Sequence, residues 1–338
     1  MMRPINKIAV LGGGAWGTAL ALTAARAGRQ VTLWARDPNV VSEIRSRQHN
    51  PRYLPGITFD EKIEATSDLR DVGSADALLL VTPAQTTRET LRALAEIDSF
   101  AVPIVLCAKG IEQSSGKLLS QVLAEELPDA IPAVLSGPSF ADDVAKGLPT
   151  AVTIACKNSE AAEMLASAMA APSFRPYAST DVTGAQIGGA LKNVLAIACG
   201  AVVGRKLGAS AQAALTARGF AELTRLGSAL GAQNETLTGL SGLGDLVLTC
   251  SSTQSRNFSF GIELGEGRKA ADLIAEGGKL AEGAHTAKVA VELARRHDVE
   301  LPICEVVAAI IRGTLSIDKA LTTLMSRPLK HEAESGRN

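Results

Sequence analysis

Short apolar runs alternate with helical stretches through the first half of the chain. Runs at 8–11, 31–34, 62–66, 77–81, 104–107, 133–136 and 151–155 have the length of buried strands, and a weaker candidate lies at 174–177. Helical patterns separate them, around 39–48, 86–96, 115–126, 139–146 and 160–169. Strands that alternate with helices predict an α/β fold with a mainly parallel, doubly wound sheet covered on both faces.

The pattern changes near Asp181. No convincing strand follows, and helical stretches rich in Ala and Gly continue to about Met325. A chain of 338 residues is also long for one core. We therefore predict an α/β domain over residues 1–182, an all-helical domain over 183–326 and a polar tail over 327–338.

A glycine-rich turn connects the first strand to the first helix. Gly12 would allow the sharp turn, Gly14 would let the backbone approach a pyrophosphate, and Gly17 would let the helix pack close to the sheet. The helix N-terminus adds N–H groups and a partial positive charge. Such turns also occur without a ligand, but the strand, helix and second strand around this one indicate a Rossmann-like dinucleotide site.

The end of the second strand bears on the choice of cofactor. An acid at this place binds a ribose 2′-hydroxyl, whereas an arginine suits a 2′-phosphate. The chain offers both, as Arg36 and Asp37. Because Arg36 comes first, we favour NADPH, with NADH tolerated.

Charge balance and cysteine content limit the classes of partner. Lys and Arg (34) nearly equal Asp and Glu (35), so no general field favours nucleic acid or an anionic membrane, and any anion site must be local. The five cysteines are odd in number, widely spaced and mostly set in apolar runs, which is typical of a reduced, cytoplasmic protein. With no C-x-x-C, no histidine pair at ligand spacing and no signal-peptide pattern, we expect neither a bound metal nor secretion.

Polar segments follow several of the predicted strands. Ligands of doubly wound sheets lie at the carboxyl ends of strands, which places 82–83, 108–110 and 137–140 on the same rim as the glycine turn. Lys109 is either a solvated loop lysine or a residue that faces the ligand, and its position directly after a strand supports the second reading as much as the first.

Lys192 is isolated in the helical half. It is the only ionisable charge between Asp181 and Arg205, and its helical neighbours are Gly, Ala and Leu. The apolar stretch could span a bilayer by length, but a central lysine and the lack of an aromatic belt or a second span disfavour a membrane helix. A buried helix with a functional lysine fits better.

A second isolated charge has the opposite sign. Asp245 is the only charge between Glu235 and Arg256, again among Gly and Leu. Because unpaired buried charges are costly, we predict that Lys192 and Asp245 approach each other. The pair is either a structural ion pair or a poised proton donor, and the surrounding glycines favour a cofactor or substrate close by.

Two further segments are candidates for binding. Arg256, between Ser255 and Asn257, offers a planar fork for a phosphate, while the alternative is a helix cap followed by a surface arginine. Glu282 lies in the glycine-rich stretch 277–283, whose alternative is a plain helix connection.

Taken in order, these motifs resemble those of the bacterial-type NAD(P)-dependent glycerol-3-phosphate dehydrogenases. The resemblance covers about residues 5 to 325. It is carried by 12–19 (GGGAWGTA), 108–110 (AKG), 136–141 (SGPSFA), 189–193 (GALKN), 242–246 (GLGDL) and 255–257 (SRN).

The resemblance implies the reversible reduction of dihydroxyacetone phosphate to sn-glycerol 3-phosphate for glycerophospholipid synthesis, by a cytoplasmic homodimer. It implies Lys192 as the general acid/base, assisted by Asp245. Implied substrate contacts are Lys109, Gly137, Ser139, Lys192, Asp245, Ser255, Arg256 and Asn257. The implied cofactor site adds Ala15, Trp16, Arg36, Lys109, Ala141, Arg256, Leu280 and Glu282 to Gly12, Gly14 and Gly17. Ala15 and Leu280 depart from the Ser and Val that are usual in the family.

Two other readings remain. The first is a sister dehydrogenase of the β-hydroxyacid or 6-phosphogluconate group, which also has a Rossmann domain followed by helices with a lysine on the first. Those proteins usually have Asn four residues after the lysine, where this chain has Ala196. The second is a nucleotide-sensing protein without turnover. Such a sensor would not need Lys192, Asp245 and Arg256 together. None of the four histidines has a setting like that of Lys192, which disfavours a histidine base.

Overall fold

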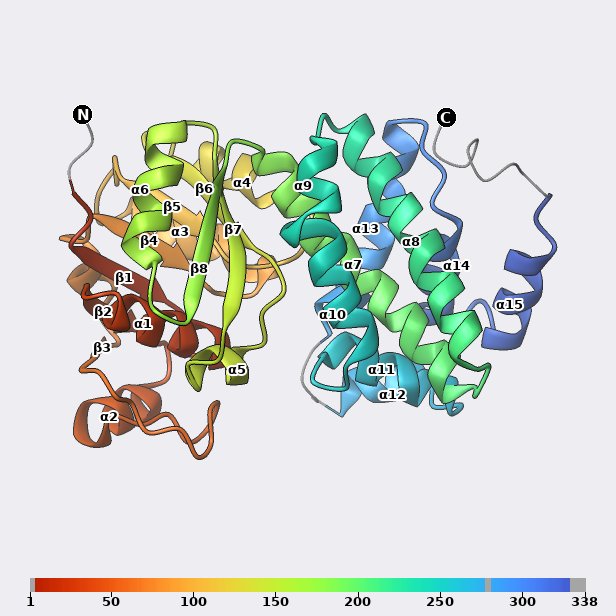
Figure 1. Ribbon diagram of the computed structural model, residues 1–338, viewed down its shortest axis with the longest axis horizontal. Helices are drawn as coiled ribbons and strands as arrows, with labels where there is room; N and C mark the ends of the chain where they lie inside the picture. The colour runs from red at the N-terminus through yellow and green to blue at the C-terminus, as the bar shows by residue number, and fades with distance from the viewer. Residues whose placement is uncertain (1–3, 277–280, 329–338) are drawn as a thin grey trace. The chain divides into compact units, whose positions relative to one another are not determined.

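The computed structural model describes residues 4–276 and 281–328. The chain forms two compact units (Figure 1). The first comprises Met1–Ala108 and Leu119–Val182, and the second comprises Lys109–Leu118 and Thr183–Asn338. A ten-residue piece of the second unit is therefore encoded inside the first.

The first unit contains one sheet with helices on its faces (Figure 1). Its described strands run in the order β3-β2-β1-β4-β5-β6-β7-β8, with every neighbouring pair parallel except β6 and β7. The strands are β1 (Lys7–Leu11), β2 (Gln30–Trp34), β3 (Glu64–Thr66), β4 (Ala77–Leu80), β5 (Pro103–Leu106), β6 (Ile131–Ser136), β7 (Thr150–Cys156) and β8 (Phe174–Ser179). The helices are α1 (Ala15–Arg26), α2 (Pro38–Arg47), η1 (Leu69–Val72), η2 (Ala84–Thr86), α3 (Thr87–Ala95), α4 (Leu119–Glu126), α5 (Ala141–Ala145) and α6 (Ser159–Met169). The mainly parallel sheet confirms the predicted Rossmann-like fold, and β1 lies between β2 and β4, where the strand order reverses.

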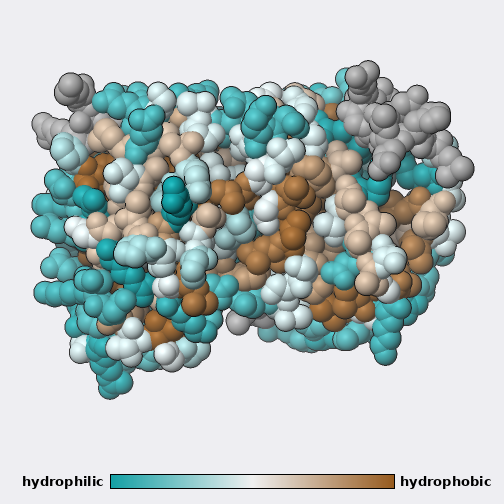
Figure 2. Space-filling view, in the orientation of Figure 1, coloured by the Kyte–Doolittle hydropathy of each residue, from teal (hydrophilic) through white to brown (hydrophobic). Residues whose placement is uncertain are grey.

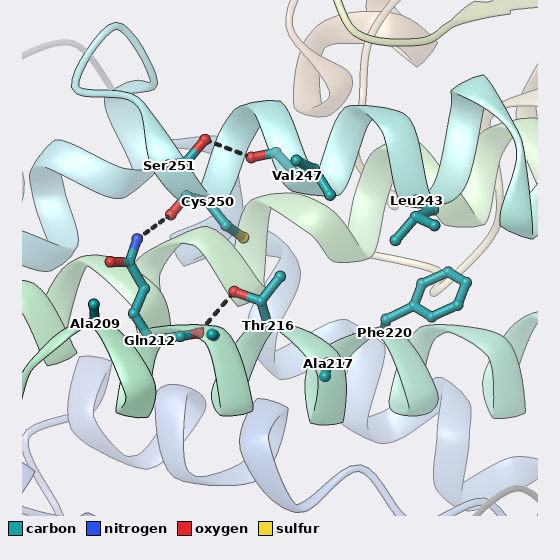
Figure 3. Close-up of a pocket in the computed structure, with 10 residues that line it drawn as sticks. Ala209, Gln212, Thr216, Ala217, Phe220, Leu243, Val247, Cys250 and Ser251 are labelled. Carbon is teal, nitrogen blue, oxygen red and sulfur yellow. Dashed lines mark hydrogen bonds between the residues drawn. The ribbon is translucent and has the colours of Figure 1, made fainter.

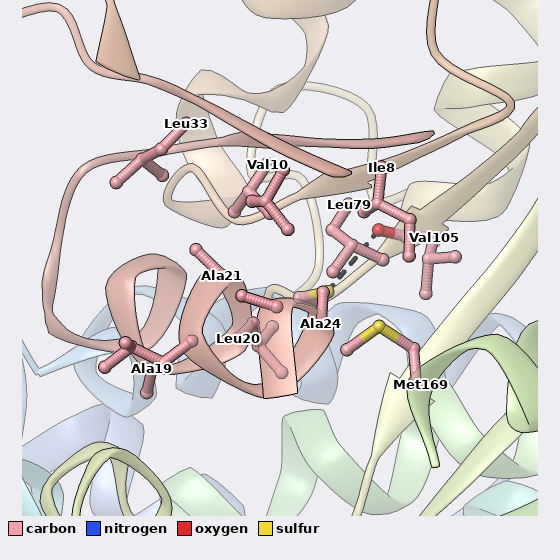
Figure 4. Close-up of a cluster of buried hydrophobic side chains, with 14 of the residues drawn as sticks. Ile8, Val10, Ala19, Leu20, Ala21, Ala24, Leu33, Leu79, Val105 and Met169 are labelled. Carbon is pink, nitrogen blue, oxygen red and sulfur yellow. Dashed lines mark hydrogen bonds between the residues drawn. The ribbon is translucent and has the colours of Figure 1, made fainter. Parts of the chain in front are cut away.

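The core of this unit explains the continuous apolar runs of the sequence. Val10, Leu33 and Leu79 from three strands are fully buried, and Leu20 of α1 is buried in the same cluster (Figure 4). A parallel sheet that is covered on both faces needs apolar residues on both sides of each strand.

One predicted helix begins later than expected. We expected a helix from about 115, but α4 begins at Leu119. Gly116 has a φ of 73°, and Ile111 pairs with Leu118 in an isolated antiparallel bridge. The left-handed glycine and the bridge together form a turn, which a helix could not accommodate.

In its described residues the second unit has helices joined by loops and no strand, apart from that bridge. Its elements are α7 (Val182–Gly204), α8 (Ala209–Ala229), α9 (Asn234–Thr238), the π-helical turn η3 (Leu240–Gly244), α10 (Asp245–Ser251), α11 (Arg256–Gly265), α12 (Ala270–Ala275), α13 (Glu282–Arg296), α14 (Pro302–Ile311) and α15 (Ile317–Met325). Among the described helices, α7 alone is long and apolar enough to cross a membrane, and 83% of its apolar window is buried inside the structure. It has the burial of a core helix.

Glycines allow α7 and α11 to pack backbone against backbone. A Cβ at Gly200 would lie 2.1 Å from the carbonyl oxygen of Phe258, and one at Gly261 would lie 2.1 Å from that of Ile197. Neither position can hold a side chain, so only glycine permits this close approach of α11 to the helix that carries Lys192.

Candidate active site

The glycine turn of the first unit has the predicted backbone geometry. Gly12 has a φ of 137°, and a Cβ there would lie 2.9 Å from the carbonyl oxygen of Val81. A Cβ at Gly17 would lie 1.8 Å from the carbonyl oxygen of Gly12, so α1 can start this close to the strand only with glycine. In contrast, a Cβ at Gly14 would meet no atom within 4 Å. The backbone at Gly14 is open on the side where a ligand would approach.

The start of α1 fits an anionic cofactor. No side chain caps this helix, and no acidic residue lies in its first turn, which begins with Ala15 and Trp16. Its first N–H groups therefore have no intrahelical acceptor and favour a negative group. The indole nitrogen of Trp16 and the hydroxyl of Thr82 are also buried without a partner among the described residues. Buried polar atoms of this kind usually bind something, and a dinucleotide would supply acceptors.

The other predicted residues of the first unit lie at strand ends. Arg36 follows β2, is exposed, and makes no hydrogen bond or ion pair with any described residue. Gly137 follows β6 with a φ of 138°, and a Cβ there would lie 2.9 Å from the Cα of Val152. The Ser139 hydroxyl donates to the Gly137 carbonyl at 3.1 Å, and Ala141 begins α5. All four therefore stay candidates, with Arg36 available to a ligand.

The second unit brings the two isolated charges together. Lys192 of α7 donates a hydrogen bond to Oδ1 of Asp245, the first residue of α10, which confirms the predicted pair. Lys109 Nζ donates to Oδ2 of the same carboxylate at 2.7 Å. The side chains of Lys109, Lys192 and Asp245 are 14%, 7% and 0% exposed. One buried carboxylate thus holds two ammonium groups.

Thr249 completes this cluster and was not predicted. Its hydroxyl accepts a hydrogen bond from Lys192 Nζ at 2.9 Å and lies 3.3 Å from Oδ1 of Asp245. The signal was its position four residues after Asp245 in an apolar run, because residues at that spacing share a helix face.

The buried setting changes the acidity of Lys192. Burial lowers the pKa of Lys192 to about 8; the Asp245 carboxylate opposes this shift and the Lys109 ammonium adds to it. Lys192 is therefore a stronger acid than an exposed lysine while it remains mostly protonated at neutral pH.

A chain of amide hydrogen bonds fixes the backbone of Lys109. The N–H of Gly283 donates to Asn257 Oδ1 at 2.9 Å, Asn257 Nδ2 donates to Asn193 Oδ1 at 3.0 Å, and Asn193 Nδ2 donates to the Lys109 carbonyl at 2.9 Å. Asn193 and Asn257 are both buried. Sequence reasoning missed this role of Asn193, because the link to Lys109 spans 84 residues.

Arg256 stands at the start of α11. Ser255 is the N-cap, since its hydroxyl accepts from the Phe258 N–H at 3.3 Å. The cap reading of Ser255 is therefore correct, yet Arg256 is exposed and makes no hydrogen bond or ion pair with any described residue. Glu282 begins α13, and Leu280 lies outside the described residues.

The glycines near the charge pair have a packing role that the sequence did not reveal. A Cβ at Gly188 would lie 2.4 Å from the Ser241 carbonyl oxygen, and one at Gly242 would lie 1.9 Å from that of Leu237. We expected such glycines to make room for a ligand, but at these two positions the backbone of the unit itself takes the space.

The outer face of α10 is apolar. A pocket of about 500 Å³ lies between this face and α8, lined by Phe220, Leu243 and Val247 among others (Figure 3). Leu243 is 37% exposed and Val247 is 51% exposed, and hydrophobic residues show on this surface in Figure 2. Asp245 and Thr249 do not line the pocket, so α10 has a buried face with charge and an opposite face from which Val247 and Ser251 line the pocket.

Known proteins with related sequences decide the family. The family model described as the NAD-dependent glycerol-3-phosphate dehydrogenase N-terminus matches residues 7–162, and the model for the C-terminus matches residues 181–322. The chain belongs to the NAD-dependent glycerol-3-phosphate dehydrogenase family. The first match contains the glycine turn, and the second contains Lys192, Asp245 and Arg256.

Individual members of this family are similar over almost the whole chain. A glycerol-3-phosphate dehydrogenase (NAD(P)+) of Parvibaculum lavamentivorans is 56% identical over 327 residues, which is 97% of this chain and 98% of that protein. One from Rhodopseudomonas palustris is also 56% identical and covers 98% of this chain and 100% of its own length. The crystal structure of glycerol-3-phosphate dehydrogenase from Coxiella burnetii has a TM-score of 0.90 at 40% identity and covers 96% of this chain and 99% of that one. The glycerol-3-phosphate dehydrogenase fold is thus shared from end to end.

Proposed function

We propose that this chain reversibly reduces dihydroxyacetone phosphate to sn-glycerol 3-phosphate with NADPH or NADH. The family supports the substrate and the cofactor class. The observation that carries the chemistry is the buried cluster of Lys192, Asp245 and Thr249, which holds an ammonium group with a lowered pKa.

The first unit provides the dinucleotide site. The open backbone at Gly14 and the N-terminus of α1 would hold the pyrophosphate, while Trp16 and Arg36 would contact other parts of the cofactor. The bound nicotinamide supplies a hydride to the substrate carbonyl. The remaining proposed cofactor contacts are Ala141, Lys109, Arg256, Leu280 and Glu282.

Lys192 provides the proton. Hydride addition to a ketone leaves an alkoxide, which an ammonium group stabilises and then protonates. Asp245 and Thr249 hold Lys192 Nζ in place by two hydrogen bonds. In the reverse direction, neutral Lys192 takes the hydroxyl proton of sn-glycerol 3-phosphate.

Arg256 is the proposed anchor of the substrate phosphate. The chain has a net charge of −1, so a phosphate needs a local cation, and the Arg256 guanidinium at the N-terminus of α11 offers one. Lys109, held by Asp245, adds positive charge within the second unit. The further proposed substrate contacts are Gly137, Ser139, Ser255 and Asn257.

We also propose a cytoplasmic homodimer that supplies glycerophospholipid synthesis. The family resemblance supports the dimer, and the exposed Leu243 and Val247 support an interface on the helical unit. Light scattering after size-exclusion chromatography tests the subunit count.

The decisive experiment follows nicotinamide absorbance while purified protein meets dihydroxyacetone phosphate, with NADPH and NADH in parallel. Wild-type protein should oxidise the cofactor, and Lys192→Ala should bind it without turnover. If wild type binds the dinucleotide but leaves this substrate unreduced, the protein is a sister dehydrogenase or a sensor. Lost cofactor binding in Lys192→Ala would favour the sensor.

A further inference from the structure

The loop after α2 is tied to the glycine turn. Asn50 is fully buried, and its Nδ2 donates to the Gly13 carbonyl at 3.0 Å and to the Thr18 hydroxyl at 2.8 Å. The Asn50 carbonyl in turn accepts from the Leu54 N–H at 2.9 Å. Arg52 is therefore carried on a short turn whose first residue is anchored to the dinucleotide site.

That turn brings Arg52 to the residue that would otherwise select NADH. Arg52 Nη1 donates to Oδ2 of Asp37, directly after Arg36 at the end of β2. The Arg52 guanidinium also lies 5.3 Å from the centre of the Tyr53 ring, which gives it a second contact.

Both oxygens of Asp37 are engaged. Oδ1 accepts from the Asn39 N–H at 2.9 Å and thereby caps α2, and Oδ2 accepts from Arg52. A carboxylate that caps a helix and whose charge is balanced by an arginine is a weaker acceptor for a ribose 2′-hydroxyl than an unpaired one. Arg36, in contrast, makes no hydrogen bond or ion pair with any described residue.

We propose that Arg52 is a specificity residue that, with Arg36, makes a two-arginine site for the 2′-phosphate of NADPH. This inference rests on the proposed function and deepens it. Arg36 and Arg52 together have two positive charges, whereas Asp37 has one negative charge. Arg52 has five N–H donors, its side chain is 62% exposed, and its ion pair with Asp37 uses one nitrogen, so donors remain for a phosphate. NADH would meet an acid that is already occupied.

The test measures binding of two cofactor fragments to the full-length protein by isothermal titration calorimetry. The fragments are 2′,5′-ADP, which carries the extra phosphate, and 5′-ADP, which lacks it. Wild type should bind 2′,5′-ADP more tightly. Arg52→Ala should weaken binding of 2′,5′-ADP about tenfold, as expected for one charge-assisted contact. Binding of 5′-ADP should stay the same or become tighter, because Asp37 loses its ion pair with Arg52.

Arg47→Ala is the matched control. Arg47 is the last residue of α2, is 72% exposed, and pairs with Glu43 at 3.6 Å, so its loss removes one exposed positive charge five residues before Arg52. It should leave the preference for 2′,5′-ADP unchanged. An equal loss in Arg47→Ala and Arg52→Ala would mean a general charge effect and would overturn the proposal.

Two other outcomes also decide it. If Arg52→Ala changes the affinity for both fragments equally, or for neither, Arg52 only supports Asp37 as a cap. The proposal is then wrong. If wild type discriminates between the fragments as expected but does not reduce dihydroxyacetone phosphate with either cofactor, the phosphate site stands and the proposed reaction fails.

Discussion

The two units present charge to a ligand in opposite ways. The glycine turn of the first unit has no charged side chain at the open backbone of Gly14, and its attraction for an anion comes from backbone N–H groups at the start of α1. The cluster of the second unit consists of charged side chains, with Asp245 fully buried between Lys109 and Lys192. A backbone site depends on the absence of side chains, whereas a buried charge site depends on each partner. Substitutions should therefore damage the two sites differently.

The largest expected effect is in the charge cluster. Lys192→Ala removes the proposed proton donor, and general acid catalysis contributes about 10²–10⁴-fold, so kcat should fall by that factor. Binding of NADPH, measured by fluorescence titration, should change little because Lys192 is not among the proposed cofactor contacts. A kcat within tenfold of wild type would remove Lys192 from the mechanism.

The glycine turn should distinguish stability from binding. Gly17→Ala places a Cβ 1.8 Å from a backbone oxygen and should destabilise the protein by about 1–3 kcal/mol, measured as a lower Tm. Gly14→Ala meets no atom within 4 Å and should keep Tm, yet weaken NADPH binding about tenfold because its methyl group lies where the pyrophosphate would approach. If Gly14→Ala binds NADPH normally, the pyrophosphate does not contact this backbone.

The pH dependence should report the lowered pKa of Lys192. Reduction needs the ammonium form, so kcat/KM for dihydroxyacetone phosphate should fall about tenfold for each pH unit above about 8. Oxidation of sn-glycerol 3-phosphate needs the neutral amine and should rise up to the same pH and then level off. A reduction rate that stays flat to pH 10 would contradict the shift.

The smallest expected effect is at Thr249. Thr249→Val keeps the shape and removes the acceptor of one Lys192 hydrogen bond, so kcat/KM should fall about tenfold. The fall in reduction rate should also begin at lower pH, since that bond favours the charged lysine. The control is Thr216→Val, on α8, where Thr216 lines the apolar pocket. It should leave the pH profile unchanged.

The sequence predicted what local patterns encode. Apolar runs gave the sheet, the glycines gave the turn, and two isolated charges in apolar stretches gave the pair of Lys192 with Asp245, because a buried charge needs a partner. The missed features depend on contacts between distant segments. No pattern around Asn193 points to Lys109, and the glycines near Lys192 could not be assigned to packing until the backbone of Ser241 was seen beside Gly188.

The insertion of Lys109–Leu118 has a consequence for synthesis and inheritance. Ile111 and Leu118 belong to the hydrophobic core of the second unit, although the residues on both sides belong to the first. On the ribosome these ten residues emerge well before α7 and must wait for their partners. A fragment that starts at Thr183 would lack Lys109 and part of its own core. Gene fusion or recombination could therefore not exchange the helical unit as one continuous segment and keep the complete charge cluster.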